Sequence, residues 1–185
     1  SPNIGGVPEL ANENLRKASH NAALPFTRCV AGPADYTPAG FSMPGDVLPV
    51  QHLACAYLIT SPLMTLAENP FYLFREERLR PALEFLRELP VCWNETVVLP
   101  QSRVGSLAAF ARRDGETWYL SIAAAQAAQE TFELDFLDKG PYTMTLLEEN
   151  GQEGFRRTER PVETGDLLPL DLPRNGGAVA RFNRR

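Results

Sequence analysis

Short runs rich in β-branched and aromatic residues, separated by Gly, Asp, Asn and Pro, fill the chain from about residue 90 to its C-terminus. Runs of this kind are typical of antiparallel strands joined by tight turns. Asp114 and Gly115 lie between two of them and predict a β-hairpin. Strands at this spacing predict a β-sandwich of two sheets. The expected strands are 96–99, 104–112, 117–123, 130–134, 142–148, 155–162, 167–170 and 177–182.

The first part of the chain, up to about residue 89, has helical patterns separated by prolines. Residues 49–60 predict a helix that ends at Ser61, because a residue that precedes a proline disfavours helical geometry. Residues 63–68 predict a short helical turn. Residues 76–89 predict an amphipathic helix, whose inward stripe would be Leu79, Leu83, Leu86 and Leu89. The chain is therefore expected to be α+β, with helices first and the sandwich second.

The overall composition excludes several classes of protein. The 185 residues carry a formal net charge of −5, and we expect no nucleic-acid partner because phosphate binding needs clustered Lys and Arg. No apolar run approaches the roughly 20 residues that span a bilayer, so we expect no membrane partner. The first residues lack the basic start and apolar stretch of a signal peptide. The chain also begins without Met, which fits a mature form or a piece of a longer protein.

The three cysteines, Cys29, Cys55 and Cys92, are far apart and form no Cys-x-x-Cys motif. An odd number at such spacing supports neither a disulfide framework nor a zinc site. We therefore expect buried free thiols.

Few residues are candidates for catalysis. His52 lies within a predicted helix, where a structural role is expected. His20 follows a polar stretch that contains Glu9 and Glu13, and a carboxylate with an imidazole can serve acid–base chemistry or bind a metal. A loop with solvated acids explains the same stretch equally well. No Gly-x-Ser-x-Gly elbow, phosphate-binding loop or dinucleotide-binding motif is present.

Two further segments have both a structural and a functional interpretation. Asp35 and Tyr36 follow Gly32 and Pro33 and predict a rigid turn with an exposed acid and an aromatic ring. Such a turn is a simple loop, or it lines a sugar-binding site. Residues 93–96 join the two halves and are expected to be a packing element between them.

Several blocks of sequence occur in the same order in a known family. Residues 24–28 read LPFTR, and residues 31–41 read AGPADYTPAGF. Together they resemble the LPFTR…AGPMDYTPGGF block of glycoside hydrolase family 97. The other blocks that resemble the family are 52–54 with 61–63 (its HQLA…SPL helix), 67–70 (its ADSP), 93–96 (its WDET), and 111–115 with 118–119 (its ARRSG…WY).

This resemblance implies a particular domain organisation. Members of the family cleave α-linked glucosides or galactosides, and have an N-terminal β-sandwich, a central (β/α)8 barrel and a small C-terminal β-sandwich. Residues 1–89 would then be the C-terminal end of the catalytic barrel domain, and residues 90–185 the C-terminal sandwich. The expected ligand is an α-linked oligosaccharide, and the expected location is periplasmic or extracellular, as for the family.

The resemblance is weakest at the family's catalytic segment. Family members carry Glu-Gly-Val-x-Gly-x-Glu, whose glutamates supply a calcium ligand and the proton donor, but Gly5 and Ala11 occupy those positions here. Glu9 and Glu13 are the remaining candidates for the catalytic acids. His20 matches the histidine of the family's PEH motif and, with Asp35 and Tyr36, is a candidate substrate contact. Calcium is expected for the family and is doubtful in this chain, whose metal ligands stay undefined.

A glycosidase needs two carboxylates held about 5 to 9.5 Å apart, and a barrel site is assembled from loops that follow several strands. We therefore expect this chain to be the C-terminal portion or a degenerate relative of a family 97 α-glycoside hydrolase, to lack a complete active site and to be inactive alone. Two other interpretations stay open. One is a carbohydrate-binding module that uses exposed aromatics, although aromatics at strand positions are expected to be buried; the other is a homo-oligomer formed through an open sheet edge. The aromatics concerned are Trp93, Trp118, Tyr119 and Tyr142.

Overall fold

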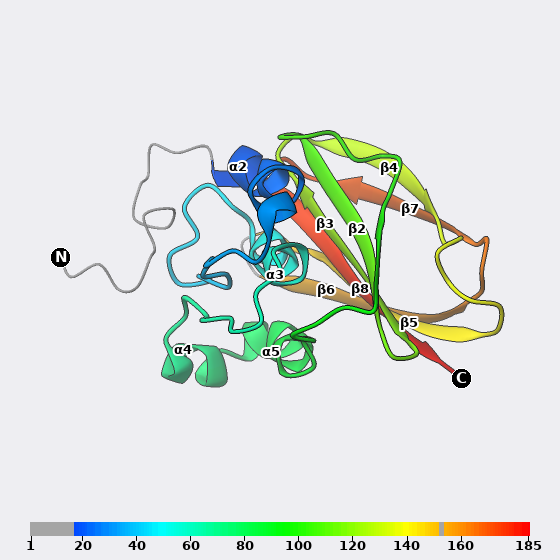
Figure 1. Ribbon diagram of the computed structural model, residues 1–185. Helices are drawn as coiled ribbons and strands as arrows, with labels where there is room; N and C mark the ends of the chain where they lie inside the picture. Colours follow the sequence, from blue (N-terminus) through cyan, green and yellow to red (C-terminus); the bar gives the residue numbers. More distant parts are fainter. Residues whose placement is uncertain (1–16, 152–153) are drawn as a thin grey trace.

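A computed structural model describes residues 17–151 and 154–185, and shows helices packed on one face of an antiparallel sheet (Figure 1). A second, smaller sheet covers the other face. The helical layer comes first in the chain, and the two sheets follow. This arrangement confirms the predicted α+β class and the predicted sandwich.

The helical layer consists of short elements. Its central member, α3 (Pro49–Leu58), begins with a proline in its first turn, where a missing N–H costs nothing. All ten residues of α3 are buried, because the helix lies between the sheet and the other helical segments. The remaining elements are α2 (Lys17–Ala23), η1 (Leu24–Phe26), η2 (Arg28–Ala31), α4 (Pro70–Arg75), η3 (Glu77–Leu79) and α5 (Arg80–Arg87).

Two sheets make up the sandwich. The larger sheet has the strand order β1-β2-β3-β8-β5-β6, and the smaller sheet pairs β4 with β7. Every pairing is antiparallel. The strands are β1 (Glu95–Val98), β2 (Leu107–Asp114), β3 (Thr117–Ala124), β4 (Ala128–Glu133), β5 (Tyr142–Glu149), β6 (Phe155–Val162), β7 (Leu167–Leu172) and β8 (Gly176–Arg184).

All eight expected strands are present, to within three residues at each end. The predicted hairpin is confirmed as well: Asp114 pairs with Thr117, and Gly115 takes the positive φ of 57° that this tight turn requires. The helix expected at 49–60 is found as α3. The helix expected at 76–89 begins as η3 and continues as α5, and its deepest side chains are Leu79, Ala82 and Phe85.

The helical turn expected at 63–68 is wrong, because that segment is irregular. Glu68 at its end is turned toward Ser42, whose backbone N–H and hydroxyl both donate to the carboxylate, at 2.6 and 2.7 Å. Helix α4 begins only after this contact. The side chain of Asn69 caps it by accepting from the backbone N–H of Phe71 at 2.9 Å.

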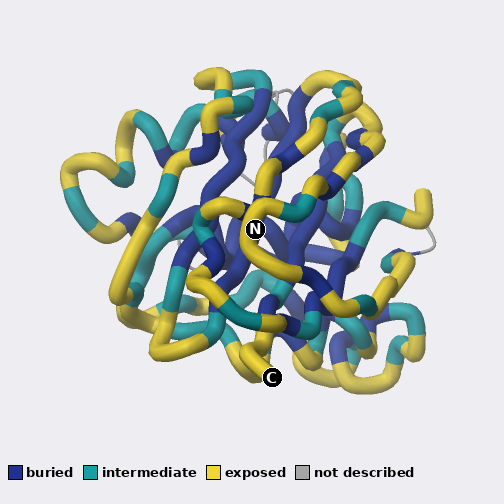
Figure 2. Tube along the Cα trace, turned by 90° about the vertical axis from the view of Figure 1, so that its right-hand side faces the viewer, coloured by how far each residue is buried: buried dark blue, intermediate teal, exposed yellow. Residues whose placement is uncertain are grey.

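The larger sheet separates two hydrophobic cores. One lies between the helices and the sheet and is centred on α3; the other lies between the two sheets. Figure 2 shows the buried strands running through the middle of the molecule, with the exposed residues at its turns and loops. Gly177 lets α3 approach β8, since a Cβ there would lie 2.3 Å from the carbonyl oxygen of Ile122 and 3.2 Å from the Cα of Gln51.

Candidate functional site

Two ionisable side chains of the larger sheet, Glu149 and Arg112, hold the two ends of α3. At the N-terminus, Leu48 provides no side-chain cap, and the carboxylate of Glu149 on β5 accepts instead from the backbone N–H of Gln51 at 3.1 Å. The first turn of a helix has unsatisfied N–H groups and a partial positive charge. Glu149 therefore satisfies one of the backbone N–H groups at this end of α3.

At the C-terminus of α3, Arg112 on β2 has the complementary role. Its guanidinium donates to the carbonyl oxygens of Tyr57, at 2.5 Å, and Leu58, at 3.0 Å. Its carbon Cζ lies 5.6 Å from the ring centroid of Trp93 and 5.4 Å from that of Phe110. A cation at a helix C-terminus is favourable, so the sheet holds one end of α3 by a hydrogen bond to Glu149 and the other by the charge and hydrogen bonds of Arg112.

The buried amide of Gln51 joins the helix to the strands. Its Nε2 donates to the carbonyl oxygens of Ala124 on β3 and Gly176 on β8, both at 3.0 Å. Its Oε1 accepts from Asn21 on α2 at 3.4 Å, and Asn21 in turn accepts from the hydroxyl of Tyr36 at 2.8 Å. This network connects α2, α3 and the sheet through polar groups that each have a partner.

Burial changes the ionisation of the groups around α3. It raises the pKa of Glu149 to about 8, although hydrogen bonds from the backbone of Val50, Gln51 and Gly177 partly oppose this. It lowers the pKa of Arg112 to about 10. It also lowers the pKa of His52 to about 4, so that this imidazole is neutral at pH 7 and its Nε2 lies 3.1 Å from the carbonyl oxygen of Pro44. His52 thus has the structural role expected for it.

The predicted site residues fall into two groups. Glu9 and Glu13 lie outside the described residues. His20 on α2 and Asp35 are exposed, whereas Tyr36 is half-buried and tied to Asn21. Their role as substrate contacts stays a prediction.

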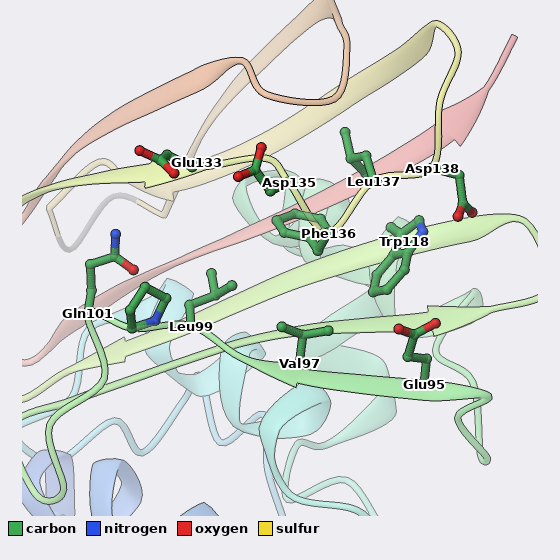
Figure 3. A pocket seen from close by; sticks show the side chains of 11 residues that line it. Glu95, Val97, Leu99, Gln101, Trp118, Glu133, Asp135, Phe136, Leu137 and Asp138 are labelled. Carbon is green, nitrogen blue, oxygen red and sulfur yellow. The ribbon is translucent and has the colours of Figure 1, made fainter.

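An acidic groove of about 610 Å³ opens between β1 and the segment that follows β4 (Figure 3). Glu95 and Val97 point into it from β1, and Asp135 and Phe136 lie on the opposite wall. Trp118 forms its floor, packed against Phe136 with ring centroids 5.3 Å apart. The lining residues are Glu95, Val97, Leu99, Pro100, Gln101, Trp118, Glu133, Asp135, Phe136, Leu137 and Asp138.

The aromatics of the sandwich are part of its cores. Trp118, Tyr119 and Tyr142 are 1%, 6% and 0% exposed, which confirms their expected burial and leaves no ring face for a sugar to stack on. Trp93 packs against Tyr57 and Tyr119, with centroids 6.2 and 5.6 Å apart. The segment that joins the two halves is therefore a packing element, as predicted.

Potential metal ligands and the three cysteines lie apart from one another in the part of the chain that is described. Within residues 17–151 and 154–185, no three His, Cys, Asp or Glu side chains converge to hold a metal ion. All three cysteines are free. Cys55 is buried as expected and Cys29 is half-buried, but Cys92 is exposed, because it lies in the surface connection that precedes β1. None of the described helices has the length and apolar character needed to cross a bilayer.

Sequence reasoning missed Arg112, Glu149 and Gln51. The neighbouring sequence shows each of them only as a polar residue of a strand or helix. The groups that each one contacts are distant in sequence, so no local pattern indicates the contact. The described residues together define a β-sandwich unit with a helical layer fixed to one face.

Comparisons with known proteins assign this unit to a family. Residues 92–183 match the family described as "Glycosyl-hydrolase 97 C-terminal, oligomerisation". A probable retaining α-galactosidase of Streptomyces bingchenggensis is 32% identical over 91% of this chain, and a retaining α-galactosidase of Bacteroides thetaiotaomicron is 25% identical over 97%. The chain spans 26% and 30% of the length of these relatives.

Solved structures agree with the sequence comparisons. A family 97 enzyme from Pseudoalteromonas sp., in complex with acarbose, is 28% identical and superposes with a TM-score of 0.78 over 91% of this chain and 29% of its own. A β-arabinopyranosidase that is 19% identical shares the fold, with a TM-score of 0.82 over 94% of this chain and 29% of its own. The chain belongs to glycoside hydrolase family 97, and residues 92–183 are its C-terminal domain.

Proposed function

We propose that this chain acts as the C-terminal part of an α-glycoside hydrolase, in which the sandwich supports the catalytic domain and residues 17–87 form the layer between them. The observation that carries this proposal is the attachment of α3. Glu149 and Arg112 hold its two ends, and its ten residues are buried in a core shared with the sheet. Because the helical layer is fixed to the sandwich, a catalytic domain that packs on the other side of the layer is held in a defined position relative to the sandwich.

The far side of the helical layer has the character of a contact surface. Helix α4 lies at the edge of the molecule away from the β4–β7 sheet (Figure 1). On it, Phe71 and Phe74 are 73% and 61% exposed. Leu63 and Met43, in the neighbouring loops, are 85% and 55% exposed. These exposed apolar side chains support the proposal that another domain covers this side of the helical layer.

The substrate of the complete protein is proposed from its relatives. Two curated relatives are named retaining α-galactosidases, so we propose that the complete protein hydrolyses α-galactosides, with α-glucosides as the alternative. Calcium at the catalytic centre and a periplasmic or extracellular location are part of the same proposal.

Self-association is a second proposed role. The family that matches residues 92–183 is described as an oligomerisation domain, and no strand of the described residues pairs with the outer side of β1 or of β6 in the larger sheet. We therefore propose that the complete protein is a homo-oligomer held together through its sandwich.

The first role can be tested with a chimera. Residues 17–185 would replace the matching part of the Streptomyces bingchenggensis relative, and hydrolysis of an aryl α-galactoside and an aryl α-glucoside would be compared with that of this chain alone and of the truncated relative. We expect no turnover by this chain or by the truncated relative, and turnover by the chimera. Activity of the isolated chain, or full activity of the truncated relative, would contradict the proposal.

A further inference from the structure

The two edges of the larger sheet differ in how well they are protected. Edge strand β6 carries three arginines and a proline, features that prevent an edge from pairing with another chain: Arg156, Arg157, Arg160 and Pro161. Edge strand β1 has no proline and no lysine, and three of its four residues, Thr96, Val97 and Val98, are β-branched. The side chain of Val98 is 50% exposed. The edge at β1 is therefore the one open to pairing.

The ladder between β1 and β2 shows which backbone groups are free to pair. The N–H of Leu99 donates to the carbonyl oxygen of Ala109 at 2.9 Å, and the register pairs Val97 with Ala111. Antiparallel pairs alternate between hydrogen-bonded and non-hydrogen-bonded, so Leu99 and Val97 turn their backbone groups toward β2. Thr96 and Val98 must then turn theirs away from β2, toward the free edge.

We propose that β1 is the strand through which two copies of this chain associate, by antiparallel pairing about a two-fold axis at Val97. Thr96 of one copy then lies opposite Val98 of the other, and each such pair exchanges two backbone hydrogen bonds. This inference rests on the proposed role of the sandwich in self-association, and adds the strand and the register.

The side chains are compatible with this register. On the face that carries Val98, Thr96 of one copy lies opposite Val98 of the other. Both residues are β-branched, and such residues form a favourable cross-strand pair. On the groove face, Val97 meets Val97, and Glu95 meets Leu99 of the other copy. No like charges are directly opposed, and Glu95 already has a counter-ion in Arg113 at 3.0 Å. Pairing at β6 would instead bring the arginines of two copies together.

Hydrogen exchange tests the proposal on the unmodified chain. We expect the amides of Thr96 and Val98 to exchange rapidly at about 5 µM protein and to be protected at about 200 µM, a range that suits a small interface. The amide of Leu99, already bonded to Ala109, is the internal control and should be protected at both concentrations. Equal exchange of Thr96 and Val98 at the two concentrations would overturn the proposal.

Variants measured by light scattering test it independently. Val98→Lys adds a charge at the open edge, and Thr96→Pro removes an outward N–H without touching the β2 ladder. Each should weaken the dimer tenfold or more. Thr158→Lys makes a matched change on β6 and should leave the dimer intact. A dimer lost in Thr158→Lys and kept in Val98→Lys would place the interface at β6 and overturn the proposal, as would a wild-type chain that stays monomeric at about 200 µM.

The outcome is separable from that of the chimera experiment. Activity of the chimera reports only on the catalytic role. The mass from light scattering and the exchange of amide hydrogens report only on whether two copies pair through β1. An inactive chimera with an intact dimer would refute the catalytic role alone, and an active chimera with a monomeric chain would refute the dimer alone.

Discussion

The carboxyl group of Glu149 lies in an environment that opposes its ionisation. Burial raises its pKa to about 8 in the folded chain, while in the unfolded chain the ordinary value near 4.5 applies. The folded state therefore retains the proton where the unfolded state releases it. The resulting contribution to stability is fully present below about pH 4.5 and is lost as the pH rises toward 8.

Glu149→Gln should remove this pH dependence, because the amide keeps an oxygen acceptor for the N–H of Gln51 and does not ionise. We expect the variant to equal the wild type near pH 4 and to exceed it by about 1–3 kcal/mol near pH 8.5. Urea unfolding at the two pH values measures the difference. Glu148→Gln, which alters the neighbouring carboxylate paired with Arg156 at 3.0 Å, is the control and should show no comparable gain. A Glu149→Gln variant that is less stable at pH 8.5 would refute this account.

At the scale of elements, α3 depends on Arg112 for its C-terminus. In Arg112→Met the chain loses two charge-assisted hydrogen bonds and leaves the carbonyls of Tyr57 and Leu58 without donors. We expect a loss of about 2–4 kcal/mol in the free energy of unfolding. Arg112→Lys should recover part of it, since lysine has the charge but not the planar fork. Arg113→Met, next along β2 and in a half-exposed ion pair with Glu95, should cost under about 1 kcal/mol. Equal losses in Arg112→Met and Arg113→Met would show that α3 is held by other contacts.

The strands could be predicted because their signals are local. Alternating side chains and turn residues such as Asp114 and Gly115 lie within a few positions of one another. The sequence also contains a signal for α4, since Asn69 before Pro70 is typical of a helix start, but residues 63–68 carry a competing helical pattern. The contacts of Arg112 and Glu149 could not be predicted, because they join residues 55 and 98 positions apart. Sequence periodicity shows that such residues are polar and does not show what they bind.

At the scale of the whole molecule, the helical layer and the sandwich share one core. On the face of the sheet covered by α3, Phe110, Tyr119, Leu147 and Val179 are almost completely buried. Further contacts hold α5 in place: Arg181 on β8 pairs with Glu88 just after α5, and the hydroxyl of Tyr57 on α3 donates to the carbonyl oxygen of Phe85 on α5 at 2.7 Å. Two parts that share a core in this way are expected to unfold together.

Calorimetry should therefore show one cooperative transition for the whole chain, with a calorimetric enthalpy equal to the van't Hoff enthalpy. Residues 90–185 expressed alone would expose the apolar face that α3 covers. We expect this shorter chain to unfold at least about 10 °C lower or to aggregate. Two separate transitions in the whole chain, or an unchanged midpoint for residues 90–185, would show that the sandwich folds independently of the helices. In that case the helical layer would not be held rigidly by the sandwich. The proposal that the sandwich supports the catalytic domain through this layer would then lose the observation on which it rests.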